Sequence, residues 1–516
     1  MPQEETAEAG APAETAAPPP SQQANDLALA ARNTLKLGAS LIATWSVAFI
    51  VRFQLPRYLG PERFGAFNFT DNFAGAFFTI VELGVDTYII RECAVRPKHA
   101  NDFFGGIMLL RLAVGMLLFV AMASTLAVTH RPLEVQAAVV VFGITYFLST
   151  LNNSLGALLQ AAGTVGRLAI SNVASKFAWG GGLAVAIWWK GSLPYLAAPL
   201  LLSELLRTAV LLPAARAAIG LRFEMHYQMA KKTFLASLPF FVNSWAIALG
   251  ARLNVSMLEF IVDDPREVGW FGATMNLGSL ALLLSPLIMW VLLPLLARAK
   301  ARSIEEAFTI VQRTNEGLVV AIVPVTLMIS LGAPLLVRIA FGRNFAEAAP
   351  SLAVFSPSFV LMYVAMTFSI LLMTFDRSWT VTLISASSIP VRAVLVLALV
   401  PLCARWYGAG GAATGASAAE VLTGVYSVAA SGIAIGRRAV DRRALLAFLK
   451  SLACAIVVTF LDRALVSIGW KRLAVDVVVY VVLALLLRVV VVRDVMAAIK
   501  LVRARKQPAP PPAPAA

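Results

Sequence analysis

Five basic side chains lie within apolar segments long enough to cross a membrane, and they are the residues best suited to bind an anion. They are Arg52, Arg111, Lys176, Arg252 and Arg392. A charge inside lipid is costly, so such residues usually face a polar cavity or an opposite charge. Because the planar arginine guanidinium can hold two phosphate oxygens at once, we interpret the five as the lining of a cationic cavity that binds substrate. The alternative is that these long side chains reach the membrane surface or form structural ion pairs.

Four acidic side chains occur in segments of the same kind. Glu82 and Asp86 are four residues apart and share one face of a helix. Basic residues lie nearby, so we interpret this pair as part of a structural or gating ion-pair cluster. Glu204 and Glu420 lie in the middle of two other segments, where each is a candidate for proton coupling. For Glu204 the alternative is a local ion pair with Arg207, one helical turn away.

Two further polar residues, Asp71 and Asn72, follow a turn near the outer end of a predicted helix and are candidates for contact with a sugar. Cys93, Cys403 and Cys454 are far apart, which favours neither a disulfide framework nor a zinc site. No segment has the pattern of a nucleotide site. The sequence therefore predicts no cofactor and no metal, and a function other than an enzyme.

The composition predicts an all-α protein that crosses the membrane many times. Of the 516 residues 59% are hydrophobic and 14% charged, and the mean hydropathy is +0.78, whereas a soluble domain is about half apolar and a quarter charged. A membrane-crossing helix needs about 20 apolar residues. About fourteen segments of that length are expected, at 36–57, 67–91, 104–128, 135–160, 166–189, 193–212, 235–261, 268–297, 314–337, 351–375, 379–402, 411–435, 444–468 and 473–496.

The distribution of basic residues predicts which side of the membrane each loop faces. The most basic loops are at 216–232, 298–302 and 436–443, and basic loops favour the cytoplasm. Both termini are then cytoplasmic. The net charge of +15 is explained by this bias and by a face toward anionic lipids, so a role in nucleic-acid binding is not favoured.

The sequence also contains an internal repeat. The stretch from Pro61 to Phe67 (PERFGAF) aligns with the stretch from Pro265 to Phe271 (PREVGWF), and Glu204 aligns with Glu420. Repeats of six helices each have the same orientation, so they predict two lobes related by a pseudo-twofold axis along the membrane normal. The repeated turn is interpreted as a hinge between the first two helices of each lobe. The predicted divisions are a disordered cytoplasmic tail (1–33), the N-lobe (34–217), a basic cytoplasmic linker (218–234), the C-lobe (235–436), two further helices (437–498) and a basic, then Pro/Ala-rich tail (499–516).

Several segments together resemble the polysaccharide-export branch of the multidrug/oligosaccharidyl-lipid/polysaccharide flippase superfamily. They occur in the order that the family would place them: RYLGPERFGAF, VELGVDTYIIRECA, LLQAAGTVGRLA, SLPFFVNSW, EVGWFGATMNL, LVRIAFGRNFAEAAPSLAVFSP and GAGGAATGASAAE. The chain looks like an O-antigen-type (Wzx-type) flippase for lipid-linked oligosaccharides. This resemblance implies two six-helix lobes, a V-shaped central cavity and two extra C-terminal helices.

The function expected from these observations is transport of a polyprenyl-diphosphate-linked oligosaccharide, an O-antigen or other exopolysaccharide repeat unit, across a bacterial inner membrane by alternating access. The partners would be this lipid-linked oligosaccharide and membrane lipids, and also polysaccharide polymerase and chain-length proteins. Alternatives from the same superfamily are a multidrug exporter and a flippase for peptidoglycan or teichoic precursors. A membrane-embedded polymerase or ligase would need a sizeable external catalytic loop, which the sequence lacks, and a pure scaffold would not need charges in both halves.

Overall fold

The computed structural model describes residues 20–82, 84–93, 100–222, 224, 227–262, 264–281, 285–436 and 442–487. Within these ranges the regular structure is entirely helical. Nine of the described segments are long enough and apolar enough to cross a membrane. The predicted all-α membrane architecture is confirmed, whereas the number of fourteen crossings stays a prediction.

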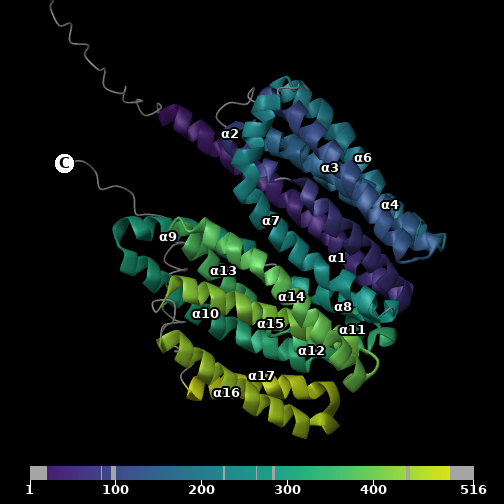
Figure 1. Ribbon diagram of the computed structural model, residues 1–516. Coiled ribbons are helices and arrows are strands. Elements are labelled where there is room, and N and C mark those ends of the chain that lie inside the picture. Colours follow the sequence, from purple (N-terminus) through teal and green to yellow (C-terminus); the bar gives the residue numbers. More distant parts are fainter. Residues whose placement is uncertain are drawn as a thin grey trace, which may run out of the picture.

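The first half of the chain forms one bundle, the N-lobe (Figure 1). Its elements are α1 (Pro20–Phe78), η1 (Thr79–Glu82), α2 (Val85–Cys93), α3 (Ala100–Val128), α4 (Leu133–Ala161), α5 (Val165–Trp188) and α6 (Leu193–Ile219). The helix α1 consists of two predicted crossings that meet at Gly60, whose φ of 72° and ψ of 172° are not helical. A positive φ costs glycine little, and Pro61 suits the first turn of the helix that follows. The predicted turn between the first two crossings is thus confirmed.

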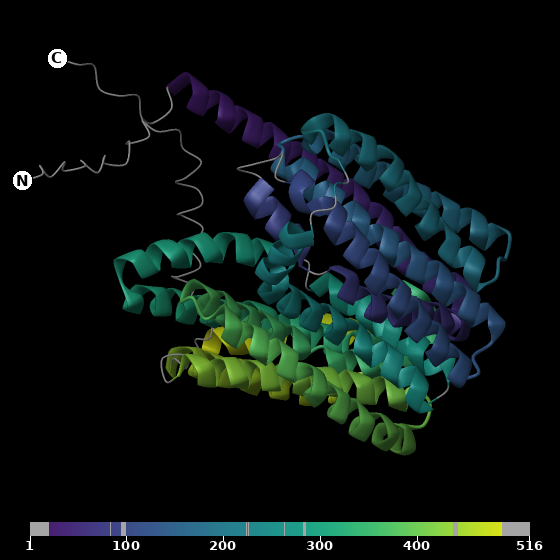
Figure 2. The same ribbon diagram turned by 45° about the horizontal axis from the view of Figure 1, so that its top comes forward.

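The second half forms the C-lobe. Its elements are α7 (Tyr227–Val262), α8 (Pro265–Ala281), α9 (Ser285–Arg302), α10 (Ile304–Leu331), α11 (Ala333–Phe341), η3 (Arg343–Phe345), α12 (Ala348–Phe355), α13 (Ser358–Thr374), α14 (Ser378–Tyr407) and α15 (Gly411–Ile435). Two more helices, α16 (Arg442–Ala464) and α17 (Arg472–Leu486), are joined by η5 (Val466–Lys471) and pack on α10 at the outer edge of the C-lobe. Figure 2 shows the same two bundles from a second direction.

The predicted N-terminal tail requires a correction. Residues 20–33 were expected to be disordered, but α1 begins at Pro20 and continues without a break into the first crossing. The segment SQQANDLALAARN is rich in alanine, leucine and glutamine, which favour helices, so it extends the crossing helix. Residues 1–19 and the predicted tail at 499–516 lie outside the described residues.

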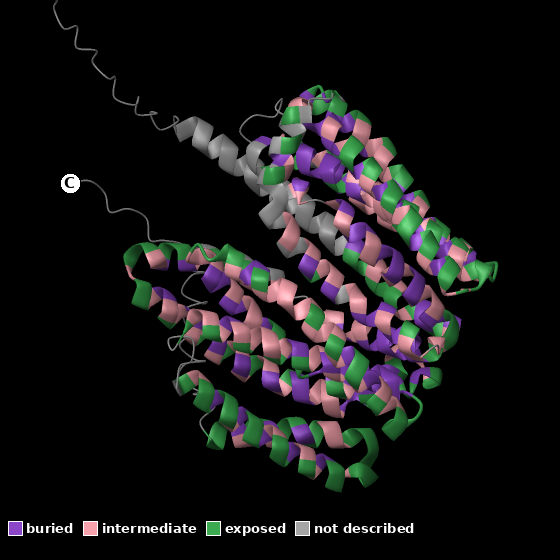
Figure 3. Cartoon of the chain, viewed as in Figure 1, coloured by how far each residue is buried: buried purple, intermediate pink, exposed green. Residues whose placement is uncertain are grey.

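Among the described residues, the buried cluster that joins most helices of the two lobes lies at one end of the molecule. We call this the kink end, because it holds Gly60. There a single cluster of buried side chains joins α1, α4 and α6 to α7, α8, α11, α12, α14 and α15. Toward the opposite end, one cluster belongs to N-lobe helices and the beginning of α7, and another belongs to the C-lobe. The bundles accordingly converge at the kink end and diverge away from it (Figures 1 and 3).

The repeated motif lies at the centre of the kink end. Gly65 of α1 and Gly269 of α8 are equivalent positions in the two copies of the motif, and each packs against the backbone of the other copy. A β-carbon on Gly65 would lie 1.6 Å from the Pro265 carbonyl oxygen, and one on Gly269 would lie 2.0 Å from the Pro61 oxygen. The lobes therefore touch through a reciprocal backbone contact, which we call the glycine crossing. The motif is a contact between lobes as well as a turn.

Candidate functional site

Arg252 of α7 lies at the boundary between the lobes, against α1 and α4. Its Nη1 donates a hydrogen bond to the Tyr146 hydroxyl at 3.0 Å, and its guanidinium lies 4.6 Å from the centre of the Tyr146 ring. The same hydroxyl donates to Asp71 Oδ1 at 2.5 Å. Gly75 leaves room for the guanidinium, since a β-carbon there would lie 2.0 Å from Arg252 Nη1. These side chains join three helices, two from the N-lobe and one from the C-lobe.

Arg52 and Lys176 form a second group of cations. Arg52 Nη1 donates to Ser279 Oγ of α8 at 2.5 Å, and Asn276 Nδ2 donates to the Arg52 carbonyl at 3.4 Å, so this arginine also connects the lobes. Lys176 of the neighbouring helix α5 places its ammonium 5.0 Å from the centre of the Trp179 ring, a cation–π contact.

Arg111 of α3 lies in a polar cluster inside the N-lobe and is only 2% exposed. Its guanidinium donates to Ser154 Oγ at 2.6 Å and to the carbonyls of Thr150 at 3.3 Å and Glu82 at 2.5 Å. Asp86 lies 3.6 Å away and accepts a hydrogen bond from Ser154. This arrangement matches the ion-pair cluster that the sequence suggested for Glu82 and Asp86, although Glu82 takes part through its backbone oxygen.

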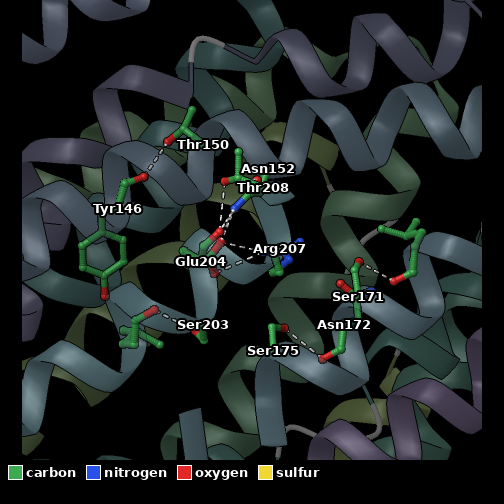
Figure 4. Close-up of polar contacts among 12 residues, drawn as sticks. Tyr146, Thr150, Asn152, Ser171, Asn172, Ser175, Ser203, Glu204, Arg207 and Thr208 are labelled. Atoms are coloured by element: carbon green, nitrogen blue, oxygen red, sulfur yellow. Dashed lines mark hydrogen bonds and ion pairs between the residues drawn. The ribbon is translucent and has the colours of Figure 1, made fainter. Parts of the chain in front are cut away.

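Glu204 of α6 is held by three neighbours (Figure 4). Asn152 of α4 donates to Glu204 Oε2 at 2.7 Å, and Arg207 forms an ion pair with the same oxygen at 3.1 Å. Thr208 donates to Asn152 Oδ1 at 2.9 Å and so orients the amide. The local pair with Arg207 that the sequence allowed is therefore formed, and the carboxylate has few lone pairs left for another ligand.

Glu420 of α15 has a similar environment in the C-lobe. Arg392 of α14 forms an ion pair with Glu420 Oε1, and Asn254 of α7 donates to the same oxygen at 2.9 Å. Arg392 follows Lys176 by 216 residues, and Glu420 follows Glu204 by the same 216 residues. Each lobe thus places a cation and a glutamate at equivalent positions. In the C-lobe Arg392 and Glu420 form an ion pair with each other. In the N-lobe Glu204 pairs with Arg207 instead, and Lys176 makes a cation–π contact with Trp179.

The five predicted cations therefore fall into two groups. Arg111 and Arg392 are neutralised by carboxylates inside their own lobes. Among the residues that the structure describes, Arg52, Lys176 and Arg252 have no ion-pair partner, and all three carry polar or aromatic contacts that orient them. A cation without a carboxylate keeps its capacity to bind an anion, so these three are the candidate anion site.

The family of this chain follows from comparison with known proteins. The sequence profile of a family described as polysaccharide biosynthesis protein matches residues 30–300, more than half of the chain. The chain belongs to the polysaccharide biosynthesis protein family. The comparison with curated proteins gave no match.

Solved structures with a similar fold are flippases and transporters. One described as lipid II flippase MurJ in an inward closed conformation has a TM-score of 0.67 at 10% identity, covering 89% of this chain and 99% of that chain. An inward-facing multidrug resistance MATE family transporter of the MOP superfamily has a TM-score of 0.58 at 15% identity, covering 76% and 98%. A mutant of the Vibrio cholerae MATE transporter VcmN gives 0.51 at 14%, covering 79% and 99%. At such low identity these likenesses show the fold alone. With nine described segments long and apolar enough to cross a membrane, this family member is a multi-pass membrane protein.

Several residues that position the site of this polysaccharide biosynthesis family member were not predicted from its sequence. Tyr146, Asn152 and Asn254 each hold one of the charges described above. Arg131 and Glu259 form a buried ion pair between the lobes at the kink end, with 2.7 Å between Nη1 and Oε1. The glutamate falls near the end of a predicted crossing and the arginine in a loop, so only their pairing in space distinguishes them.

Asn72 does not lie with the candidate site. Its amide donates to the Asn68 carbonyl at 2.9 Å and to Asn68 Oδ1 at 3.0 Å, one turn earlier on α1. Asp71, by contrast, accepts from Tyr146 at the lobe boundary. Of the two predicted sugar contacts, Asp71 is thus the one beside the cations, and sugar binding by either residue stays a prediction.

Proposed function

We propose that this chain is a flippase that moves a polyprenyl-diphosphate-linked oligosaccharide, such as an O-antigen or exopolysaccharide repeat unit, from the cytoplasmic to the outer leaflet of a bacterial inner membrane. Membership of the polysaccharide biosynthesis family supports this substrate, and so do three oriented cations at or near the lobe boundary that have no carboxylate partner among the described residues. The proposed work is transport rather than catalysis.

The cost of moving the glycan explains why a protein is needed. Each hydroxyl placed in hydrocarbon without a hydrogen-bond partner costs about 4–8 kcal/mol, so a short glycan faces tens of kcal/mol. A polar path between the two lobes would remove most of this cost, while the lipid tail stays in the bilayer. Arg52, Lys176 and Arg252 would hold the diphosphate, because guanidinium and ammonium groups donate strong hydrogen bonds to phosphate oxygens.

The distribution of charge gives the proposed direction. The basic loops at 298–302 and 436–443 follow helices that end away from the kink end, so the positive-inside rule places the kink end outside. The shared core at the kink end then closes the outer side, and the separate cores lie toward the cytoplasm. An inside-negative potential drives negative charges outward. For about two charges the gain is roughly 5 kcal/mol per 100 mV.

The test is transport by purified protein in lipid vesicles, with a polyprenyl-diphosphate oligosaccharide and membrane potential as variables. We expect Arg252→Ala, Arg52→Ala and Lys176→Ala each to reduce the rate about tenfold or more, since each removes a charged hydrogen bond worth about 1.5–3 kcal/mol. Arg302→Ala is the matched control, because Arg302 is exposed and pairs with Glu306 away from the lobe boundary. Unchanged rates in all three variants, or transport of organic cations in place of the glycolipid, would contradict the proposal.

Tyr146→Phe tests the positioning of Arg252 separately. The variant keeps the ring under the guanidinium but loses the hydroxyl that connects Arg252 to Asp71. We expect transport to fall about tenfold, which corresponds to about 1.4 kcal/mol, with little change in protein level. Tyr426→Phe, which removes a hydroxyl bonded to Ser387 within the C-lobe, provides the control. Equal activity of the two variants would show that the hydroxyl of Tyr146 does not position the arginine.

A further inference from the structure

The two C-terminal helices bury an acidic pair that the proposed transport site does not use. Asp476 of α17 is 0% exposed and Asp462 of α16 is 6% exposed. Arg472 lies beside them, with its Nε 2.9 Å from Asp462 Oδ1. The buried face of α17 consists of Asp476, Tyr480 and Ala484, at successive helical turns. The first residue of the buried face of α17 is therefore an aspartate, Asp476.

The charges around Asp476 do not balance if both aspartates are ionised. Among the described residues, Arg472 is the cation one helical turn from Asp476 on α17, and it already pairs with Asp462. Neither carboxylate oxygen of Asp476 receives a hydrogen bond from the described residues. The part of α10 that packs here, from residue 317 to residue 331, contains no ionisable residue. The nearby groups on α16 and α17 that titrate at higher pH, Cys454 and Tyr480, are neutral at pH 7.

Val458 of α16 and Tyr480 of α17 belong to one buried cluster. Asp462 lies one turn after Val458 and Asp476 one turn before Tyr480, so the two buried carboxyl groups face each other across the helix pair. Two ionised carboxylates can only accept hydrogen bonds, so the contact requires a proton on one of them. An isolated ionised carboxylate in an apolar interior takes up a proton rather than remain charged, and two adjacent carboxylates commonly hold one proton between them.

We propose that Asp462 and Asp476 form a proton-binding site in which one shared proton is retained above the pH at which an ordinary aspartate releases it, and that this proton holds α16 and α17 together. With the proton bound, the Asp476 carboxyl donates to Asp462, and Asp462 forms its ion pair with Arg472, so each buried charge has a partner. Loss of the proton leaves a net negative charge buried beside apolar residues of α10. The site lies toward the kink end of the two helices, apart from Arg52, Lys176 and Arg252.

The sign of the effect on stability follows from the bound proton. The folded protein holds a proton that the unfolded chain releases near the ordinary aspartate pKa of about 3.9, so stability falls as the pH rises above about 4. In Asp476→Asn the amide is always neutral and can donate to Asp462, so the variant should fold without the proton and lose this dependence on pH.

The experiment uses the full-length protein in detergent or lipid nanodiscs. Infrared spectroscopy at about pH 5.5, where an ordinary aspartate with a pKa of about 3.9 is ionised, should show the C=O band of a protonated carboxyl group. We expect Asp476→Asn to remove one such band and to make the unfolding temperature less dependent on pH between about 4 and 7. The control Glu306→Gln, at an exposed ion pair, should leave both measurements as in the unmodified protein.

Two results would overturn the proposal. One is a wild-type spectrum at about pH 5.5 without a protonated-carboxyl band, which needs no variant and so does not depend on folding of a mutant. The other is a band that persists in Asp476→Asn, with unfolding temperatures that follow pH as the wild type does. A second variant, Asp462→Asn, should also remove the band, because Asp476 can then ionise beside Arg472.

Discussion

Replacement of Gly65 or Gly269 by alanine should severely destabilise the closed contact between the two lobes. At these positions a β-carbon would lie 1.6 Å from the Pro265 oxygen and 2.0 Å from the Pro61 oxygen. Both obstacles are backbone atoms of packed helices, which cannot rotate away as the end of a flexible side chain could. Overpacking of a core typically costs about 1–3 kcal/mol, and a shift of a whole helix should place these variants at or above the upper end of that range.

The measurement is the unfolding temperature of each purified variant, together with its level in the membrane. Gly181→Ala is the matched control, because Gly181 lies within the helix α5 and a β-carbon there would meet no atom within 4 Å. Alanine is a better helix former than glycine by up to about 1 kcal/mol, so this control should be neutral or stabilising. If Gly65→Ala behaved like Gly181→Ala, the glycine crossing would not exist in the protein.

The glycine crossing also shows what the sequence could and could not predict about the fold. The repeat of PERFGAF and PREVGWF was visible in the sequence, and so was the turn at Gly60. The sequence could not show that the two copies contact each other, because an alignment of two repeats does not reveal which of their surfaces are in contact. Two equivalent glycines at the same motif position were a signal, since a pseudo-twofold axis brings equivalent positions together wherever it passes.

The charged residues of the candidate site were likewise predicted from the sequence, but the partners of these residues were not. Composition alone makes Arg111 and Arg252 equally unusual within apolar segments. Their roles separate only when Asp86 is found beside Arg111 and a tyrosine beside Arg252. A tyrosine in an apolar helix is common, so nothing in the sequence distinguished Tyr146 as a residue of the site. The shared spacing that relates Lys176 to Arg392 was present in the sequence and could have been found by extending the repeat.

Loss of either partner of the Arg131–Glu259 ion pair should cost about 3–5 kcal/mol, because it removes this ion-pair partner from a buried charge. The pair joins the turn between α3 and α4 to α7, so it connects the lobes at the kink end. Arg131 is 13% exposed and Glu259 is 4% exposed. The guanidinium lies beside the rings of Phe69 and Phe260, 5.3 Å from each centre, so water has little access to either charge.

The double variant Arg131→Gln with Glu259→Gln separates the ion pair from the packing. Both charges are then removed together and no buried charge is left alone, so most of the lost stability should return. Arg302→Gln with Glu306→Gln is the control at an exposed pair, where single and double variants should differ little. Unfolding temperatures of the single and double variants give the coupling between the two residues. Additive losses would mean that the ion pair makes no contribution of its own.

The same pair should also control opening of the kink end under the proposed transport cycle. Release of the glycan outside requires α7 to separate from the α3–α4 turn, and this exposes both charges to water. In the open state water hydrates each charge, so the ion pair contributes little there. The pair therefore favours the closed state. In the double glutamine variant we expect the closed state to be less favoured, so a cysteine introduced for Phe69 should react faster with a membrane-impermeant thiol reagent added outside. An unchanged rate of labelling would show that the glycine crossing, rather than this pair, keeps the kink end closed.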